Sequence, residues 1–240
     1  MFYLRVALSL IGFLAASIYG VVIAVFRRDK KLVAHDYAQM MVKLMRPPLG
    51  LKTRIVGKEN LSKAQPCIYV ANHQSAYDVP VLAELYPAGT VVIGKKELAH
   101  IPFFGWIYRI TGNIMIDRKD NERAVGRLRE AELAIQTRGV SVWIFPEGTR
   151  GKGAGELLPF KKGAFYMAIA TGAPLVPVVA APLRPLFSLE QRHLRSGTVE
   201  VRVLDPIPTT GLTDKDLPAL IESTRTAMSA ALKEMAVIPT

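Results

Sequence analysis

The N-terminal part of the chain is dominated by apolar positions. No charged side chain occurs between Val6 and Phe26. A helix over this run would be about 32 Å long, close to the ~30 Å hydrocarbon core of a bilayer. A second apolar-rich stretch, 32–49, has methionines and leucines at near-helical spacing and is expected to end at Pro47-Pro48. The pattern predicts a hydrophobic helical segment, residues 1–50, that attaches the chain to a membrane.

Three interpretations of the first run compete. A secretory signal usually has a shorter apolar core that follows basic residues, whereas here the basic cluster of residues 27–31 comes after the run. A transmembrane helix fits the length, and a helix lying in one leaflet fits the second apolar stretch. The basic cluster favours a cytoplasmic location for the rest of the chain. We therefore expect attachment to the inner (cytoplasmic) membrane with the remaining domain on the cytoplasmic side, by a spanning or a monotopic segment.

After residue 50 the pattern changes to short apolar runs that alternate with helical stretches. Residues 103–112 are helical or mixed, and 199–205 alternate as an edge strand would. Further strands are expected at 51–57, 67–71, 91–94, 113–117, 141–145 and 174–181, and helices at 121–138, near 163–171 and at 214–235. This order predicts an α/β fold, a mixed or mostly parallel sheet covered by helices, with residues 51–240 as one domain.

Charge and cysteine content narrow the class of partner. The net charge is +11, from 31 basic and 20 acidic residues, which indicates an anionic partner such as a nucleic acid, a membrane surface or a phosphorylated substrate. No recognition helix or aromatic-basic platform is visible, so a nucleic acid is disfavoured. The single cysteine, Cys67, excludes an internal disulfide and is interpreted as a small buried side chain.

The segment N-H-Q-S-A-Y-D, residues 72–78, directly follows the strand expected at 67–71. Residues five apart do not share a face of a regular helix, so His73 must lie in a turn with Asp78 at a helix start. In that arrangement the carboxylate binds one ring nitrogen and leaves the other to accept a proton, as a general base does. The alternative is a histidine in a turn beside an aspartate that caps a helix.

The segment F-P-E-G-T-R, residues 145–150, follows another expected strand. Open α/β sheets bind ligands at the carboxyl ends of their strands, where this loop would lie. Arg150 has the planar donor array that binds a phosphate, and Thr149 and nearby N–H groups can add contacts. The alternative is a solvated loop with a Glu–Arg pair.

Two further segments lie at strand ends, and a third lies within the strand expected at 174–181. G-N-I-M-I-D-R, residues 112–118, ends in a charged group, and G-K-K-E-L, residues 94–98, carries adjacent lysines that are either solvated or directed at the same pocket. V-P-V-V, residues 176–179, is either plain core or the lining of an acyl channel.

Four of these segments, residues 72–78, 112–118, 145–150 and 176–179, occur in the order and approximate spacing of the four motifs of the glycerolipid acyltransferase family, and the chain resembles that family. The residues around them, including G-K-K-E-L, resemble its bacterial 1-acylglycerol-3-phosphate acyltransferase branch. The resemblance covers residues from about 65 to 180. It implies that residues 51–240 form the catalytic domain and transfer a fatty acyl group to the sn-2 hydroxyl of 1-acyl-glycerol-3-phosphate, giving phosphatidic acid. Lysophosphatidic acid, the acyl donor and the bilayer would be the partners, with no nucleic acid.

The resemblance also implies roles for individual residues. His73 would be the general base and Asp78 its orienting partner. Basic side chains would bind the acceptor phosphate, and the loop after the strand 141–145 would shape the acceptor site. The basic candidates are Lys95, Lys96, Arg118 and Arg150, and the loop residues are Glu147, Gly148 and Thr149.

Absent motifs define the expected mechanism. There is no G-x-S-x-G and no H-E-x-x-H, so neither a covalent acyl-enzyme nor a metal site is expected, and a hydrolase is disfavoured. We expect direct transfer from a thioester, acyl-CoA or acyl-acyl carrier protein, as co-substrate without another cofactor. An acyltransferase acting on another lysophospholipid or on a lyso-ornithine lipid is the alternative.

Overall fold

The computed structural model describes residues 1–117, 120–151, 155–235 and 237–239. Arg118 of the predicted site lies outside these residues. The α-helices are α1 (Phe2–Phe26), α2 (Lys30–Leu49), α3 (Asn60–Lys63), α4 (Asp78–Leu82), α5 (Phe104–Ile110), α6 (Asn121–Arg138), α7 (Gly163–Thr171) and α8 (Leu217–Glu234). Short 3-10 helices are η1 (Ala83–Leu85), η2 (Lys96–His100) and η3 (Asp214–Asp216).

The strands form one main sheet and a small hairpin. They are β1 (Leu51–Val56), β2 (Ile68–Ala71), β3 (Thr90–Lys95), β4 (Ile114–Ile116), β5 (Ser141–Ile144), β6 (Leu175–Ala180), β7 (Phe187–Ser188), β8 (His193–Leu194), β9 (Gly197–Val203) and β10 (Val237–Pro239). The main sheet has the order β1-β9-β6-β2-β5-β3-β4, with β10 paired to β9. Its pairs are parallel except β6–β9 and β9–β10. The predicted mixed, mostly parallel sheet is confirmed.

The segment predicted as an edge strand lies inside the sheet. β9 pairs with β1 on one side and with β6 and β10 on the other, so this prediction is wrong. Its alternation has another cause. Val199 and Val201 are buried in the core, while Glu200 and Arg202 on the opposite face are half-buried and form an ion pair at 2.6 Å.

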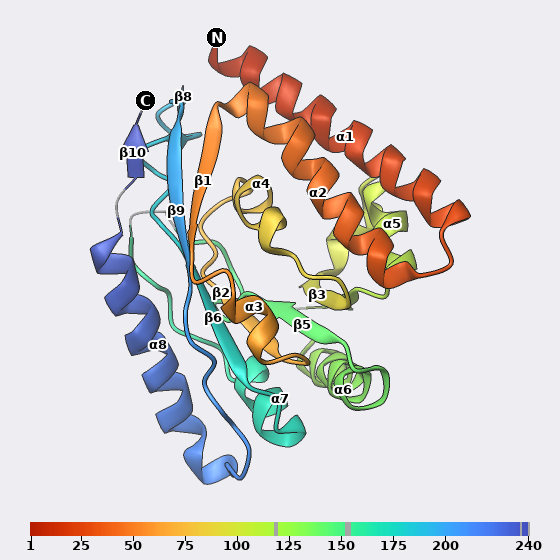
Figure 1. The fold of residues 1–240 in the computed structure, drawn as a ribbon, viewed down its shortest axis with the longest axis vertical. Helices are drawn as coiled ribbons and strands as arrows, with labels where there is room; N and C mark the ends of the chain where they lie inside the picture. Colours follow the sequence, from red (N-terminus) through yellow and green to blue (C-terminus); the bar gives the residue numbers. More distant parts are fainter. Residues whose placement is uncertain (118–119, 152–154, 236, 240) are drawn as a thin grey trace.

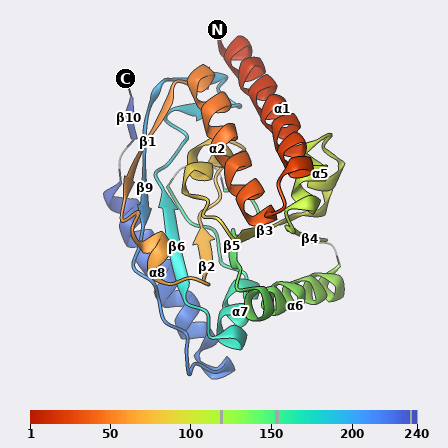
Figure 2. The same cartoon turned by 45° about the vertical axis from the view of Figure 1, so that its right-hand side comes forward.

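Helices cover both faces of the sheet (Figures 1 and 2). On one face α8 packs on β6 and α7, and α7 packs on α6. On the other face α4 lies against β6 and β1, α2 packs on α4, and α1 packs on the outer side of α2. The α1–α2 hairpin is therefore docked along the body of the protein. Its boundary with the rest of the chain is the turn at Gly50, and the division into residues 1–50 and 51–240 stays a prediction.

Small residues let α1 approach α2 closely. Its buried positions are all small: Ser9, Gly12, Ala16, Ser17, Gly20 and Ala24. A Cβ atom at Gly12 would lie 2.6 Å from the Leu44 carbonyl oxygen, so only glycine fits there. The opposite face exposes large apolar side chains along the helix, including Leu4, Ile11 and Val25. By length and composition, α1 is the one helix among the described residues that could cross a membrane.

Helix α2 ends directly after its two prolines, at the predicted end of the second apolar-rich stretch. It continues through Pro47 and Pro48 to Leu49, and Gly50 ends it in the left-handed conformation, φ 61°. The Arg5 guanidinium of α1 donates hydrogen bonds to the carbonyl oxygens of Pro48 at 2.8 Å and Leu49 at 2.6 Å. These contacts satisfy carbonyl acceptors at the helix end that would otherwise lack partners.

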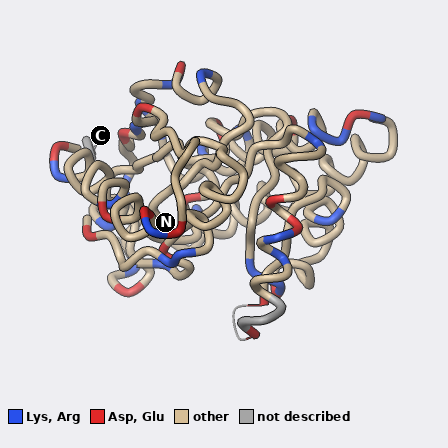
Figure 3. The backbone as a smooth tube through the Cα atoms, turned by 90° about the horizontal axis from the view of Figure 1, so that it is seen from below, with Lys and Arg blue, Asp and Glu red and all other residues tan. Residues whose placement is uncertain are grey.

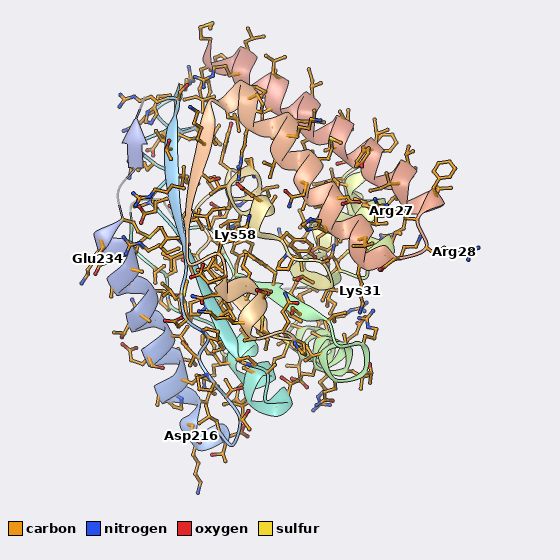
Figure 4. The ribbon with its side chains drawn as sticks, viewed as in Figure 1. Arg27, Arg28, Lys31, Lys58, Asp216 and Glu234 are labelled. Atoms are coloured by element: carbon orange, nitrogen blue, oxygen red, sulfur yellow. The ribbon has the colours of Figure 1, made fainter. Side chains whose placement is uncertain are left out.

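Charged residues are distributed over the molecule. Lys and Arg positions alternate with Asp and Glu positions along the backbone and form no continuous basic stripe in this view (Figure 3). A local basic cluster lies at the α1–α2 turn, where Arg28 points away from the protein and Arg27 and Lys31 lie nearby (Figure 4). Arg27 also forms an ion pair with Asp36 of α2.

Candidate active site

The strand register brings the predicted motifs to one edge of the sheet. β2 lies between β5 and β6 and is parallel to both, with Val70 opposite Ile144 and Ala71 opposite Val178. β3 is the next strand beyond β5 and is parallel to it. The loops that follow β2, β3 and β5 therefore leave the sheet at the same edge, where open α/β sheets bind ligands.

The hydrogen bond predicted between His73 and Asp78 is present. Nδ1 of His73 lies 2.6 Å from Oδ2 of Asp78, which is also bound by the backbone N–H groups of Gln74 at 2.7 Å and Ser75 at 3.0 Å. Asp78 begins α4 and is 1% exposed, whereas His73 is partly exposed and stacks on the ring of Phe145. This geometry leaves Nε2 of His73 as the ring nitrogen that can accept a proton.

The side chain of Glu147 holds the backbone of the histidine loop. Its Oε1 accepts a hydrogen bond from the His73 backbone N–H at 2.7 Å, and its Oε2 accepts one from Leu158 N–H at 2.9 Å. The Gly151 N–H donates to the His73 carbonyl at 2.8 Å, so the β2 and β5 loops are joined twice. Burial raises the pKa of the Glu147 carboxyl, although both N–H donors favour its ionised form.

Two amide side chains that the sequence reasoning missed hold the other side of the histidine loop. Asn72 exchanges two hydrogen bonds with the backbone of Ala180, at 3.0 and 2.8 Å. Gln74 donates to the carbonyls of Ala180 and Ala181 and accepts from Leu183 N–H. The available signal was polar residues flanking His73 directly after a fully apolar strand, because such residues must find partners when buried.

His73 and Asp78 open into a cavity of about 590 Å³. Polar groups in its lining include Lys95, Thr149 and Arg150. Most of the other lining side chains are apolar, and α1, α2 and α5 contribute Leu10, Phe13, Tyr37, Met41, Met45, Phe104 and Ile107. The cavity therefore combines polar groups with a largely apolar wall. Sequence reasoning did not foresee that the N-terminal segment supplies part of the wall.

The remaining predicted residues divide into those at the cavity and those away from it. Lys95 lines the cavity, whereas Lys96 forms an ion pair with Asp117 and is not among the lining residues described. Gly148 has φ 66°, a conformation that favours glycine, and it shapes the turn between Glu147 and Thr149. Val176–Val179 lie fully buried in β6, which matches the plain-core interpretation, and none of them is among the residues that line this cavity.

Comparison with known proteins places the chain in a family. The family model described as Acyltransferase matches residues 52–181. The chain belongs to the acyltransferase family. The 1-acyl-sn-glycerol-3-phosphate acyltransferase of Escherichia coli (strain K12) is 34% identical over 236 residues, which cover 98% of this chain and 94% of that protein. The resemblance inferred from the motifs is confirmed, and the protein is an acyltransferase.

Two further known proteins are similar to this chain over nearly its whole length. The 1-acyl-sn-glycerol-3-phosphate acyltransferase of Saccharomyces cerevisiae is 34% identical over 243 residues, covering 100% of this acyltransferase and 80% of the yeast protein. The crystal structure of the 1-acyl-sn-glycerophosphate (LPA) acyltransferase PlsC from Thermotoga maritima superposes with a TM-score of 0.77 at 26% identity, covering 98% of this chain and 97% of that one.

The single cysteine of this acyltransferase is poorly suited to act as a covalent nucleophile. Cys67 lies immediately before β2 and is fully buried, as predicted, and burial raises the pKa of its thiol to about 11. A thiol in this environment stays protonated and unreactive. Among the described residues, no group of three or more His, Cys, Asp or Glu side chains is arranged to hold a metal ion.

Proposed function

We propose that this acyltransferase transfers a fatty acyl group from an acyl thioester, acyl-CoA or acyl-acyl carrier protein, to the sn-2 hydroxyl of 1-acyl-glycerol-3-phosphate, giving phosphatidic acid. The observation that carries the proposal is the cavity shared by the His73–Asp78 pair, the cations Lys95 and Arg150, and an apolar wall. The names of the E. coli and yeast relatives support the acceptor. No other cofactor is required.

The proposed reaction follows from the geometry of the pair. Nε2 of His73 removes the proton from the acceptor hydroxyl as the oxygen attacks the thioester carbonyl. Asp78 keeps Nδ1 protonated and stabilises the imidazolium that forms. Collapse of the tetrahedral intermediate expels the thiolate, which receives the proton from His73. No acyl-enzyme is formed, so both substrates occupy the cavity together.

The cationic side chains that line the cavity are proposed to bind the acceptor phosphate. Arg150 offers two parallel donors, Lys95 adds a point charge, and Thr149 adds a hydroxyl. We assign Lys95 rather than Lys96 to this role, because Lys95 lines the cavity and Lys96 is engaged with Asp117. Glu147 and Gly148 act by shaping the loop that carries Arg150.

The test is an assay of purified protein in vesicles with lysophosphatidate and each donor in turn. His73→Ala should lower turnover by about 10²–10⁴-fold, the usual contribution of a general base. His100→Ala, at an exposed histidine of η2, is the matched control and should retain wild-type turnover. Equal turnover by His73→Ala and wild type would refute the proposed base. Accumulation of radiolabelled acyl-protein would refute direct transfer.

Phosphate recognition has a separate test. Arg150→Ala should raise the KM for lysophosphatidate by roughly 10–100-fold, since a hydrogen bond to a charged group contributes about 1.5–3 kcal/mol. Monoacylglycerol lacks the phosphate, so the KM for this acceptor should change far less. An equal loss for both acceptors would show that Arg150 has no selective role in binding the phosphate.

Membrane attachment through α1 is part of the proposal. The exposed apolar face of α1 is the contact surface, and we place it within one leaflet of the inner membrane, on the cytoplasmic side. A spanning orientation would carry the charges of α2, which is packed along α1, into the hydrocarbon core at high cost. The cluster Arg27, Arg28 and Lys31 then lies at the level of the anionic headgroups.

A further inference from the structure

A second apolar surface lies outside α1. Helix α5 and the turn before it expose Ile101, Trp106 and Ile110, and Trp106 is 56% exposed. A tryptophan side chain exposed to this extent suggests that another surface covers it, because burying such a ring is strongly favourable. Arg109 on the same short helix is also exposed.

The buried side of α5 packs directly on α1. The ring of Phe104 lies 5.2 Å from the ring of Phe13, and a Cβ atom at Gly20 would come within 3.1 Å of Ile107. Figures 1 and 2 both show α5 beside the C-terminal half of α1, and Figure 4 places Arg27 and Arg28 at that end of the hairpin. The exposed apolar residues of α5 therefore belong to a helix that borders α1 directly.

The turn before α5 holds an unfavourable backbone conformation. Phe103 has φ 60° and ψ −48°, which side chains with a Cβ rarely adopt. Gly105 follows in the first turn, packed so tightly that a Cβ there would lie 2.1 Å from the Ala99 carbonyl oxygen. Strain of this kind persists where the surroundings impose it, and it is common at functional positions. Here it sets the direction in which α5 leaves the turn.

We propose that α5 with its preceding turn is a second lipid-contacting element, which enters the headgroup boundary of the same leaflet as α1. This inference rests on the membrane attachment proposed above. Its composition fits that depth: tryptophan and arginine prefer the interface, where an aromatic ring meets acyl chains and a guanidinium meets phosphates, and they avoid the bilayer centre.

This placement has a consequence for substrate access. Leu10 of α1 and Ile101 before α5 both line the catalytic cavity and are both exposed, so the cavity opens next to the two elements. With both elements in the leaflet, a lysophospholipid reaches the opening without leaving the bilayer. Its phosphate stays at headgroup level, and its acyl chain stays among apolar side chains.

The two tryptophans of the chain allow a direct test of depth. Trp143→Phe leaves Trp106 as the only reporter, and Trp106→Phe leaves Trp143, which is 3% exposed in the core. Each variant, checked for native folding by circular dichroism, is mixed with phosphatidylcholine–phosphatidylglycerol vesicles, with and without brominated phosphatidylcholine. We expect brominated lipid to quench Trp106 and vesicles to shield it from aqueous acrylamide, with little change in Trp143.

Wild-type emission provides the same readout if Trp143→Phe does not fold, because the vesicle-dependent part should vanish in Trp106→Phe. Protein that binds vesicles while Trp106 stays unquenched by brominated lipid would overturn the inference and leave the proposed role of α1 intact. Failure to bind vesicles at all would overturn both. The fluorescence arm does not depend on the acceptor being lysophosphatidate.

An activity test uses matched surface substitutions. Trp106→Glu should reduce turnover of long-chain lysophosphatidate in vesicles roughly tenfold, because a carboxylate at this depth opposes lipid contact. Turnover of a short-chain, water-soluble lysophosphatidate should stay near wild type. Leu133→Glu, on α6 and 60% exposed, is the control and should alter neither assay. A Trp106→Glu enzyme with wild-type turnover on vesicles would contradict the inference.

Discussion

At the scale of single residues, His73 is held by its backbone as firmly as by its ring. Its N–H and C=O both bond to the loop after β5, and its ring bonds to Asp78. General bases act over a narrow range of distance and angle, so a fixed backbone limits the loss of rate from misplacement. We therefore propose that Glu147 contributes to catalysis by holding the His73 backbone and not through contact with the acceptor.

This view of Glu147 predicts the effect of Glu147→Gln. The amide has one acceptor oxygen, so its NH₂ would face one of the two backbone N–H donors. Leaving such a buried donor unpaired costs about 1–3 kcal/mol. We expect a lower melting temperature and a lower kcat with little change in KM, measured by thermal unfolding and steady-state assays. Wild-type values for both would show that the carboxylate is dispensable.

At this scale the sequence predicted which side chains lie near one another better than it predicted their individual contacts. His73 and Asp78 could be paired because a turn followed by a helix start leaves few arrangements for H-x4-D. Glu147 was expected to shape the acceptor site, and its bond to the His73 backbone could not be foreseen. That bond depends on the register between β2 and β5, strands 70 or more residues apart in the chain.

At the scale of elements, the close packing of α1 on α2 depends on small side chains. Gly12→Leu would place a side chain against the Leu44 carbonyl and force the helices apart. Overpacking of this kind costs about 1–3 kcal/mol. We expect a lower melting temperature in detergent and reduced acyl transfer, because Leu10 and Phe13 on α1 line the cavity.

The control for this substitution is Ile11→Leu, next along the helix and on the exposed face. It keeps the apolar character and should leave stability and turnover unchanged. If Gly12→Leu behaves like Ile11→Leu, the helices do not pack as described.

The positions of helices and strands were largely predictable, and the exception, the place of β9 in the sheet, has an identifiable cause. Apolar runs located the strands because interior strands of a parallel sheet are buried on both faces. The alternation in β9 suggested an edge strand. An interior strand shows the same pattern when one of its faces is only half-buried and carries paired charged residues, as β9 does with Glu200 and Arg202.

At the scale of the whole molecule, Arg5 joins parts of the chain that are far apart in sequence. Besides the end of α2, its guanidinium binds the carbonyl of Leu194 at 2.9 Å and the hydroxyl of Ser196 at 3.2 Å. Arg5→Met would leave these acceptors without their charged donor, and should lower the free energy of unfolding by about 1.5–3 kcal/mol. Chemical denaturation in detergent measures this, with Arg28→Met as the solvent-exposed control.

Equal denaturation midpoints for the two arginine variants would show that the hydrogen bonds of Arg5 do not stabilise the protein.

The overall arrangement could be predicted as far as an α/β domain with an apolar N-terminal segment. How that segment docks could not, because it is fixed by Arg5 and by glycine contacts that have no periodic signature.

The docking of α1 has a practical consequence for handling the enzyme. Hydrophobic leaders are commonly trimmed to obtain a water-soluble fragment of a membrane enzyme. Here such a truncation would remove Leu10 and Phe13 from the wall of the cavity beside His73 and the hydrogen-bond donor from the end of α2. The shortened polypeptide would keep His73 and lose part of the cavity next to it, so purification has to retain the first helix together with a detergent or lipid that covers its apolar face.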